Sequence, residues 1–232
     1  MKNPRPVENI PLVTRARVKR IAPPERLIPY RSLNIGLNHR MKRFMKAIMR
    51  LVTTILVLPL GFIFRITQSE SFFVFCGQAL ALLPGEVGSY IRVSYYRLTL
   101  NKCSKDSHIG FGSYFSHPEA EVWEGVYIGA YCVLGMVRIG NHATIGSGVY
   151  IMSGKRQHGY VEIGKPIQEQ PGKFTVVTIG ENTWIGNCAV ILADIGSQSV
   201  IGAGSVITNN TNDFEVLAGN PARVIRRLSD IR

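Results

Sequence analysis

Apolar residues return at every sixth position in the second half of the chain. Between Val177 and Thr208 the isoleucines keep this spacing except for one four-residue step, and a small side chain stands four positions after most of them. The isoleucines are Ile179, Ile185, Ile191, Ile195, Ile201 and Ile207, and the small residues are Thr183, Ala189, Ser199 and Ser205. Self-similarity at this period predicts a parallel β-helix.

Each six-residue unit of such a fold is a short strand followed by a corner. The isoleucine points inward, the small residue fits inside the narrow coil, and the glycines that follow several isoleucines permit the corner geometry. Stacked coils pair their backbones about 4.8 Å apart. Because one unit cannot bury its own isoleucine, several coils are needed for stability.

The same register runs upstream, so we expect the β-helix over residues 105–208. Its inward positions would be Val122, Ile128, Leu134, Ile139, Ile145 and Ile151, with a weaker first pair at Ile109 and Phe115 and small fillers at Cys132, Ala143 and Val149. The period fails between Ile151 and Ile179, where only Val161–Gly164 keeps its form. We therefore expect a loop excursion over residues 152–176, the kind of element that carries function on a rigid scaffold.

The N-terminal part has a different pattern. Residues 1–36 are rich in proline and arginine and predict a basic extended or disordered arm. Residues 37–104 predict helices: an amphipathic cationic stretch over 37–50, an uncharged stretch over 51–64 interrupted by Pro59 and Gly61, a second uncharged stretch over 71–85, and a connecting helix over 88–100.

The uncharged run 51–64 is shorter than the roughly 20 residues of a membrane-spanning helix. We expect a helical hairpin that contacts a membrane through residues 37–85, because a cationic amphipathic helix precedes it. The alternative is a pair of core helices that pack on the end of the β-helix. Residues 209–232 predict a tail that ends in a short helix.

Charge is concentrated at the N-terminus. The net charge is +12, and residues 1–50 contain 13 of the 27 Lys and Arg but only two of the 15 acids, which leaves the β-helix nearly neutral. Aromatic residues are not interleaved with these charges, so we expect no nucleic-acid partner. The four cysteines lack metal-ligand spacing, and no signal peptide is expected, which favours a cytoplasmic protein.

Four residues stand out as candidates for chemistry. His158 lies in the excursion, where an imidazole can act as a general base near neutral pH, or can simply be solvated. Trp184 follows an inward position, so strand alternation directs it outward, either as a ligand platform or as a subunit contact. Arg223 and Arg226 lie near the C-terminus, where arginines suit phosphate groups.

These repeats, with the segments NTWIG, IGAGSVIT and AGNPARVIR, resemble the hexapeptide-repeat acyltransferases over about residues 105–228. The galactoside, maltose and serine acetyltransferases and the polysaccharide O-acetyltransferases are the most similar branches. The resemblance implies a left-handed β-helix, a homotrimer and acetyl-CoA held between neighbouring subunits. It also implies direct attack by an acceptor hydroxyl, for which a loop histidine takes the proton.

The family roles fall on particular residues of this chain. His158 corresponds to the catalytic base, although several related sequences have histidine where Arg156 stands, and Glu162 and Glu169 are candidates to orient it. The residues implied to contact the CoA are Trp184, Asn187, Ala203, Thr208, Arg223 and Arg226. His117 and Arg156 are candidate acceptor contacts.

The expected function is therefore transfer of acetyl from acetyl-CoA to a sugar hydroxyl, on a cell-surface polysaccharide or a lipid-linked precursor, at the cytoplasmic face of the inner membrane. No metal is expected. Three alternatives stay open: a serine-type or other small-molecule acetyltransferase, a zinc hydratase that uses His117, His142 and His158, and a non-catalytic trimeric scaffold at the membrane. Cys188 as a covalent nucleophile is a rival mechanism.

Overall fold

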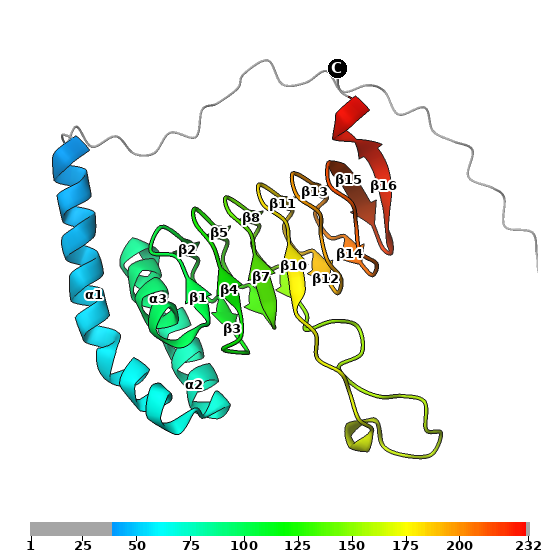
Figure 1. The fold of residues 1–232 in the computed structure, drawn as a ribbon, viewed down its shortest axis with the longest axis horizontal. Helices are drawn as coiled ribbons and strands as arrows, with labels where there is room; N and C mark the ends of the chain where they lie inside the picture. The colour runs from blue at the N-terminus through cyan, green and yellow to red at the C-terminus, as the bar shows by residue number, and fades with distance from the viewer. Residues whose placement is uncertain (1–38, 231–232) are drawn as a thin grey trace, which may run out of the picture. The chain divides into compact units, whose positions relative to one another are not determined.

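The computed structural model describes residues 39–230. The expected basic arm, residues 1–36, lies outside this range. Within it, short parallel strands form three sheets, here named A, B and C, that the chain visits in turn (Figure 1).

Sheet A contains β1 (Lys102–Cys103), β4 (Glu121–Val122), β7 (Val137–Ile139) and β10 (Val177–Ile179). Sheet B contains β2 (His108–Ile109), β5 (Tyr127–Ile128), β8 (Thr144–Ile145), β11 (Trp184–Ile185), β13 (Val200–Ile201), β15 (Glu215–Gly219) and β16 (Ala222–Arg227). Sheet C contains β3 (Tyr114–Phe115), β6 (Val133–Leu134), β9 (Tyr150–Ile151), β12 (Val190–Ile191) and β14 (Val206–Ile207).

The predicted inward positions form the core of this stack, which confirms the parallel β-helix. Each sheet contributes one column of side chains in register, such as Ile128, Ile145, Ile185 and Ile201 in sheet B. These side chains are at most 1% exposed, and the small fillers Cys132, Ala143 and Val149 are fully buried. Ile195, which follows the four-residue step, continues sheet A through a bridge to Ile179.

The excursion leaves the stack between β9 of sheet C and β10 of sheet A and includes the 3-10 helix η1 (Ile167–Glu169) (Figure 1). The expectation that Val161–Gly164 keeps the coil form is wrong: Val161 is 82% exposed and Ile163 is 103% exposed. A repeat unit buries its apolar residue only when a neighbouring coil pairs with it, and this segment lies in a loop with no strand pairing.

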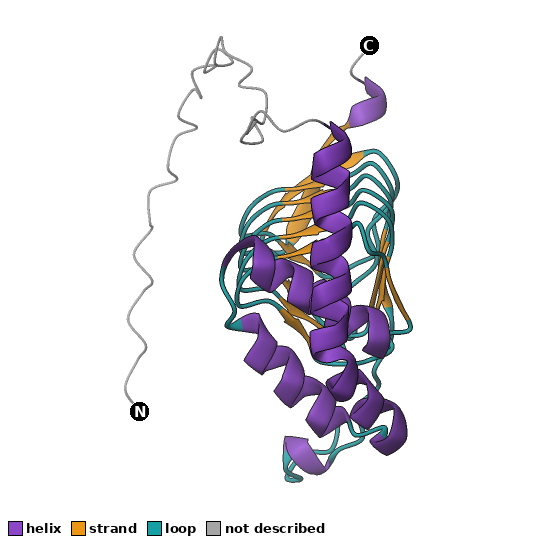
Figure 2. Cartoon of the chain, turned by 90° about the vertical axis from the view of Figure 1, so that its left-hand side faces the viewer, coloured by secondary structure: helices purple, strands orange, loops and turns teal. Residues whose placement is uncertain are grey.

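Three helices are described before the first coil: α1 (His39–Thr67), α2 (Glu70–Ala81) and α3 (Gly85–Thr99). The two stretches expected over 37–50 and 51–64 form one helix from His39, because Pro59 is accommodated within α1. Gly61 of α1 lies so close to α3 that an added Cβ would come within 2.9 Å of Leu98. Figure 2 shows α1 along its length, in front of the other helices and the coils.

Helix α3 closes the open edge of the first coil. The hydroxyl of Ser89 accepts a hydrogen bond from the backbone N–H of Ile109, and the hydroxyl of Tyr96 accepts one from Phe115. The backbone N–H groups of Ile109 and Phe115 would otherwise donate to a preceding coil. Unpaired strand edges are sites of aggregation, so the helices act as the capping unit of the solenoid.

Arg92 connects this cap to the coil from inside. Its side chain is 1% exposed, and its Nε donates to the carbonyl of Ile109 at 3.0 Å. Its Nη1 contacts the carbonyls of Leu80 and Leu83 at 3.2 and 2.6 Å, at the end of α2. Burial lowers the pKa of this guanidinium from its ordinary value. One cation thus satisfies carbonyls from two elements that otherwise face the interior.

The C-terminal segment differs from the expected short helix. Residues Ala222–Arg227 form β16, which pairs antiparallel with β15, and only the three-residue 3-10 helix η2 (Leu228–Asp230) follows. The reason is that β15 presents the last open edge of sheet B, so the returning chain gains backbone hydrogen bonds by pairing with it.

We expect Arg92→Met to lower the free energy of unfolding by about 3 kcal/mol, because it leaves buried carbonyls without donors. Arg97→Met, at an exposed position of the same helix, is the matched control and should change stability by about 0.5 kcal/mol or less. Chemical denaturation of both variants measures this. Equal stabilities would show that the Arg92 hydrogen bonds contribute nothing net.

Candidate functional site

The excursion is an ordered loop that is tied together at its neck. The backbone N–H of Thr175 donates to the carbonyl of Ser153 at 3.0 Å, and that of Lys173 donates to the carbonyl of Arg156 at 2.6 Å. Farther out, the buried side chain of Gln170 donates to the carbonyls of Glu162 and Lys165 at 3.0 Å each. The loop therefore has an internal framework although most of its surface is exposed.

A cavity of 580 Å³ lies at the foot of the excursion, and its volume is within the range of small-molecule sites. Lys155, Arg156 and Lys173 line it together with Asp194, whose Oδ1 accepts a hydrogen bond from the backbone N–H of Thr178 at 2.8 Å. Lys155 also donates to Oδ1 of Asn209 at 3.0 Å. Sequence reasoning found Arg156 but missed Lys155 and Lys173, since only the folded neck brings them together.

His158 lies on the excursion and is exposed. No carboxylate contacts its ring among the described residues. Glu162 instead forms an ion pair with Lys165 at 3.2 Å, and Glu169 belongs to the exposed η1. Neither candidate orients His158 within one chain, so any partner for the imidazole must come from another molecule or from a change in the loop.

Three of the predicted cofactor residues lie together on sheet B and the corner that follows it. Trp184 points outward from β11 and is 56% exposed. Asn187 comes at the next corner, where its Oδ1 accepts from the N–H of Ser147 at 2.9 Å and its carbonyl accepts from Gly204 at 2.8 Å. Ala203, the neighbour of Gly204 one coil later, is exposed beside it.

The other predicted cofactor residues lie at the C-terminal end. Thr208 and Arg223 line one cavity of 410 Å³, which also contains Arg227. Arg227 lies 3.7 Å from the buried carboxylate of Glu215. Arg226 lies on the same strand, β16, and pairs with Val216. Thr208 and Arg223 are thus brought together, whereas Arg226 is not among the residues that line this cavity.

The two halves of the predicted site lie on different sides of one chain. The excursion with His158 leaves at the corner between sheets C and A, whereas Trp184 lies on sheet B and Asn187 at the corner between sheets B and C. In a three-sided coil, the corner between sheets C and A is opposite sheet B. The imidazole and the indole of the same chain are therefore separated by the core.

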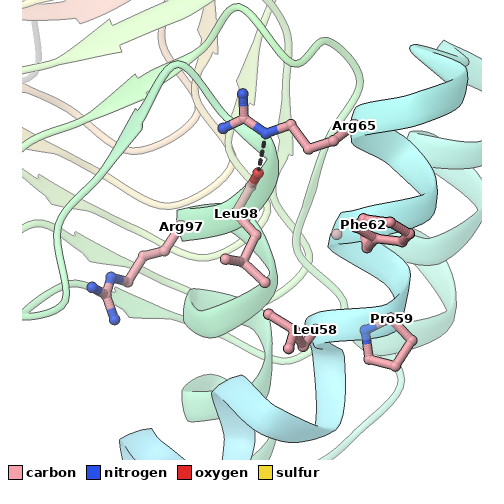
Figure 3. A pocket seen from close by; sticks show the side chains of 7 residues that line it. Leu58, Pro59, Phe62, Arg65, Arg97 and Leu98 are labelled. Carbon is pink, nitrogen blue, oxygen red and sulfur yellow. Dashed lines mark hydrogen bonds between the residues drawn. The ribbon is translucent and has the colours of Figure 1, made fainter.

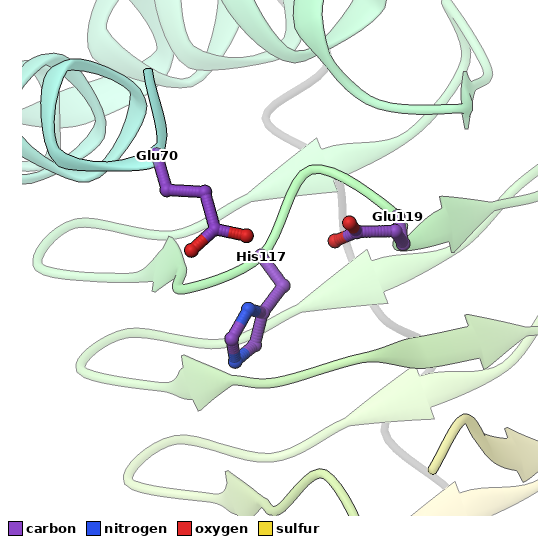
Figure 4. A group of neighbouring side chains, drawn as sticks. All are labelled: Glu70, His117 and Glu119. Carbon is purple, nitrogen blue, oxygen red and sulfur yellow. The ribbon is translucent and has the colours of Figure 1, made fainter. Parts of the chain in front are cut away.

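His117 lies beside the excursion. It follows β3, and its ring makes an edge contact with Phe174 of the excursion at 5.5 Å between centroids. Figure 4 shows it with the carboxylates of Glu70 and Glu119, and one ligand atom of each residue lies within 4.8 Å of the others. Oε2 of Glu119 is buried and has no hydrogen-bond partner among residues 39–230. The acceptor contact expected for His117 stays a prediction.

Among the described residues, the fold does not assemble the side chains of the alternative chemistries into a site. His142 lies at the corner between sheets A and B, His117 follows sheet C, and His158 lies on the excursion, so the three do not form one group among the described residues. Cys188 is exposed at a corner with a positive φ of 59°.

Comparisons with known proteins agree with the repeat pattern. No family model matches the chain. Serine acetyltransferase 2 of Arabidopsis thaliana is 34% identical over 116 residues, which cover 49% of this chain and 32% of that protein. Galactoside O-acetyltransferase of Escherichia coli K12 is 50% identical over 56 residues, which cover 23% of this chain and 28% of that protein. The matched part thus spans about a third of these relatives' own length.

A maltose O-acetyltransferase from Clostridium difficile superposes with a TM-score of 0.59 at 23% identity, over 67% of this chain and 86% of that one. The chain has the hexapeptide-repeat β-helix of these acetyltransferases. The predicted resemblance and the left-handed β-helix are confirmed. The roles predicted for individual residues are not tested by these similarities.

Trp184 offers a direct test of the predicted cofactor face. The chain has two tryptophans, and Trp123 is covered by Lys102, whose Nζ lies 3.3 Å from the ring centroid. We expect CoA to change the intrinsic fluorescence of the protein, because it would cover the exposed indole of Trp184. Trp184→Phe should abolish the change and Trp123→Phe should retain it. A CoA-dependent change that persists in Trp184→Phe would place the cofactor elsewhere.

Proposed function

We propose that this protein is an acetyl-CoA-dependent O-acetyltransferase whose acceptor is a sugar hydroxyl. The observation that carries the proposal is a hexapeptide-repeat β-helix that presents an outward Trp184 beside Asn187 and Ala203 and bears a histidine on an ordered excursion. The similarity to galactoside and serine acetyltransferases supports an acetyl group as cargo and a hydroxyl as acceptor.

In the proposed reaction His158 accepts the proton of the acceptor hydroxyl while the oxygen attacks the thioester carbonyl. Base assistance is needed because a sugar hydroxyl ionises too weakly alone. The C–S bond then breaks, the ester forms, and the imidazolium returns its proton to the CoA thiolate. Backbone N–H groups at a coil corner are suitable donors for the oxyanion of the tetrahedral intermediate.

The proposed site is completed by a second copy of the chain in a homotrimer. His158 and Trp184 of one chain lie on opposite sides of the core, so the corner with the excursion must meet sheet B of a neighbour. The excursion also exposes large apolar side chains that such contact would cover. They are Tyr160, Val161, Ile163, Ile167, Phe174 and Val176. An isolated soluble chain rarely leaves so many apolar groups together in water.

The cavity beneath the excursion is the proposed place for the acceptor. Residues of the excursion that carries His158 form part of its lining, although His158 itself does not line it. Its three cations, Lys155, Arg156 and Lys173, favour an acceptor that carries negative charge. A cell-surface polysaccharide unit or a lipid-linked precursor, handled at the cytoplasmic face of a membrane, agrees with this. A small-molecule hydroxyl, as in serine acetyltransferase, is the second candidate, favoured by the similarity over 116 residues to a serine acetyltransferase.

Removal of the candidate base tests the mechanism. We expect His158→Ala to lower kcat for acetyl-CoA turnover by about 10²–10⁴-fold with little change in the affinity for CoA. His142→Asn is the control, since this exposed corner residue has a positive φ of 57° that asparagine tolerates. Release of CoA thiol with sugars and serine as acceptors measures turnover. Full turnover by His158→Ala would exclude this residue as the base.

A site shared between two neighbouring chains predicts that two different inactive variants can complement each other. His158→Ala and Trp184→Ala chains should each form weakly active homotrimers. Coexpressed in equal amounts, they should recover about a quarter of the wild-type activity, because one in four interfaces combines an intact loop with an intact face. Recovery depends on mixing within one oligomer, so the separately purified homotrimers, mixed without exchange, are the control. No recovery on coexpression would contradict a site that His158 of one chain and Trp184 of its neighbour share.

A further inference from the structure

Helix α1 exposes a continuous apolar face that no described residue covers. Its large side chains recur at three- and four-residue spacings over the length of the helix, and each is 42–67% exposed. This set, here named the α1 face, is Met41, Phe44, Met45, Ile48, Leu51, Val52, Ile55, Leu56, Phe62, Ile63 and Ile66. At about 100° per residue these positions fall on one side of the helix.

The opposite side of α1 packs on the rest of the protein. Val57 and Phe64 are buried, Phe64 lies 5.5 Å from the ring of Phe73, and the hydroxyls of Thr53 and Ser94 are 2.8 Å apart. The helix is therefore fixed with its buried side on α2 and α3 and the α1 face directed away from them. The α1 face is therefore exposed because of the way the helix packs, and not because the helix is detached from the rest of the protein.

Charge on α1 selects the occupant of this face. The helix contains no acidic residue, and its first turns contain Arg40, Arg43 and Lys46, besides Arg50, which forms an ion pair with Asp106 at 2.6 Å. Residues 1–50 as a whole contribute 11 of the 12 net positive charges. We propose that the α1 face docks on the surface of a bilayer of anionic phospholipids, with the helix axis in the plane of the interface. An apolar face on one side and cations on the polar side of the same helix are the properties of interfacial helices.

A groove beside the α1 face extends the docking surface. Leu58, Pro59 and Phe62 of α1 and Leu98 of α3 line a cavity of 510 Å³ together with Arg65 and Arg97, whose guanidinium groups point in different directions (Figure 3). The Nε of Arg65 donates to the carbonyl of Leu98 at 3.1 Å, which holds the guanidinium beside the cavity. An acyl chain fits the apolar walls, and the Arg65 guanidinium beside them suits a lipid phosphate.

The in-plane orientation follows from length and packing. Residues Arg43–Thr67 are long and apolar enough, by composition, to cross a membrane. The uncharged stretch 51–64, however, spans only about 21 Å at 1.5 Å per residue, short of a hydrocarbon core of about 30 Å. One side of the helix is also occupied by α2 and α3, which hold the first coil, and the coils expose polar corners that belong in water.

Vesicle binding by the full-length protein tests the proposal. We expect cosedimentation with vesicles of phosphatidylglycerol and phosphatidylcholine, weaker binding to pure phosphatidylcholine, and a loss of binding at high salt. Leu56→Glu/Phe62→Glu should reduce the partition coefficient on the order of 100-fold, because two charges enter the apolar face. Val224→Glu/Ile225→Glu, at exposed residues of β16, is the matched control and should bind as the parent does.

Depth measurements separate an interfacial helix from a spanning one. Tryptophan introduced singly at Met45, Leu56 and Ile66, in a Trp123→Phe/Trp184→Phe background, would report on three points along α1. Brominated lipids should quench all three from the same shallow depth if the axis lies in the plane. A graded series, deepest at Leu56→Trp, would overturn the in-plane orientation.

Two other results would overturn the proposal itself. One is that the parent and Leu56→Glu/Phe62→Glu bind anionic vesicles equally. The other is that the double variant changes the oligomer mass without lipid, since the α1 face would then be an interface between copies. Vesicle binding requires no acetyl-CoA and should be unchanged in His158→Ala, so its failure is distinguishable from failure of the proposed acetyl transfer.

Discussion

Backbone pairing between successive coils is the interaction on which the rest of this structure depends. Each short strand is too small to be stable alone, and it is held only by the coils on either side. A stack of this kind needs closure at both of its ends. Ser89, Tyr96 and Arg92 supply donors and acceptors at the first coil, and the returning strand β16 pairs with β15 at the last. The helices are therefore part of the fold and not an appended segment.

The same constraint decides where chemistry can be placed. Inward positions are taken up by the core, so only outward strand positions, corners and insertions remain for ligands. Trp184 occupies an outward position on a sheet, and His158 an insertion at a corner opposite it. A rigid three-sided coil cannot bend to bring them together. Association of copies is the route that the geometry leaves for the proposed acyl transfer.

The sequence predicted the regular part of the molecule because one period governs it. The inward isoleucines, the buried Cys132 and the outward Trp184 all follow from the register. Features that depend on contacts between distant segments were not predictable in this way. The strand β16 forms because it pairs with the open edge of β15. Val161–Gly164 matches the repeat pattern but has no neighbouring coil that would bury its apolar residues. The hydrogen bonds of Arg92 connect two helices with a strand. Lys173 reaches the candidate site only through the neck of the excursion.

The neck gives the excursion a measure of independence. Its two ends are already hydrogen-bonded at Ser153 and Thr175, and β10 pairs with β7 directly afterwards. The coil thus closes without help from the residues between them. Evolution can lengthen, shorten or replace this insert without refolding the stack, so the part that would choose the acceptor can diverge while the scaffold stays the same.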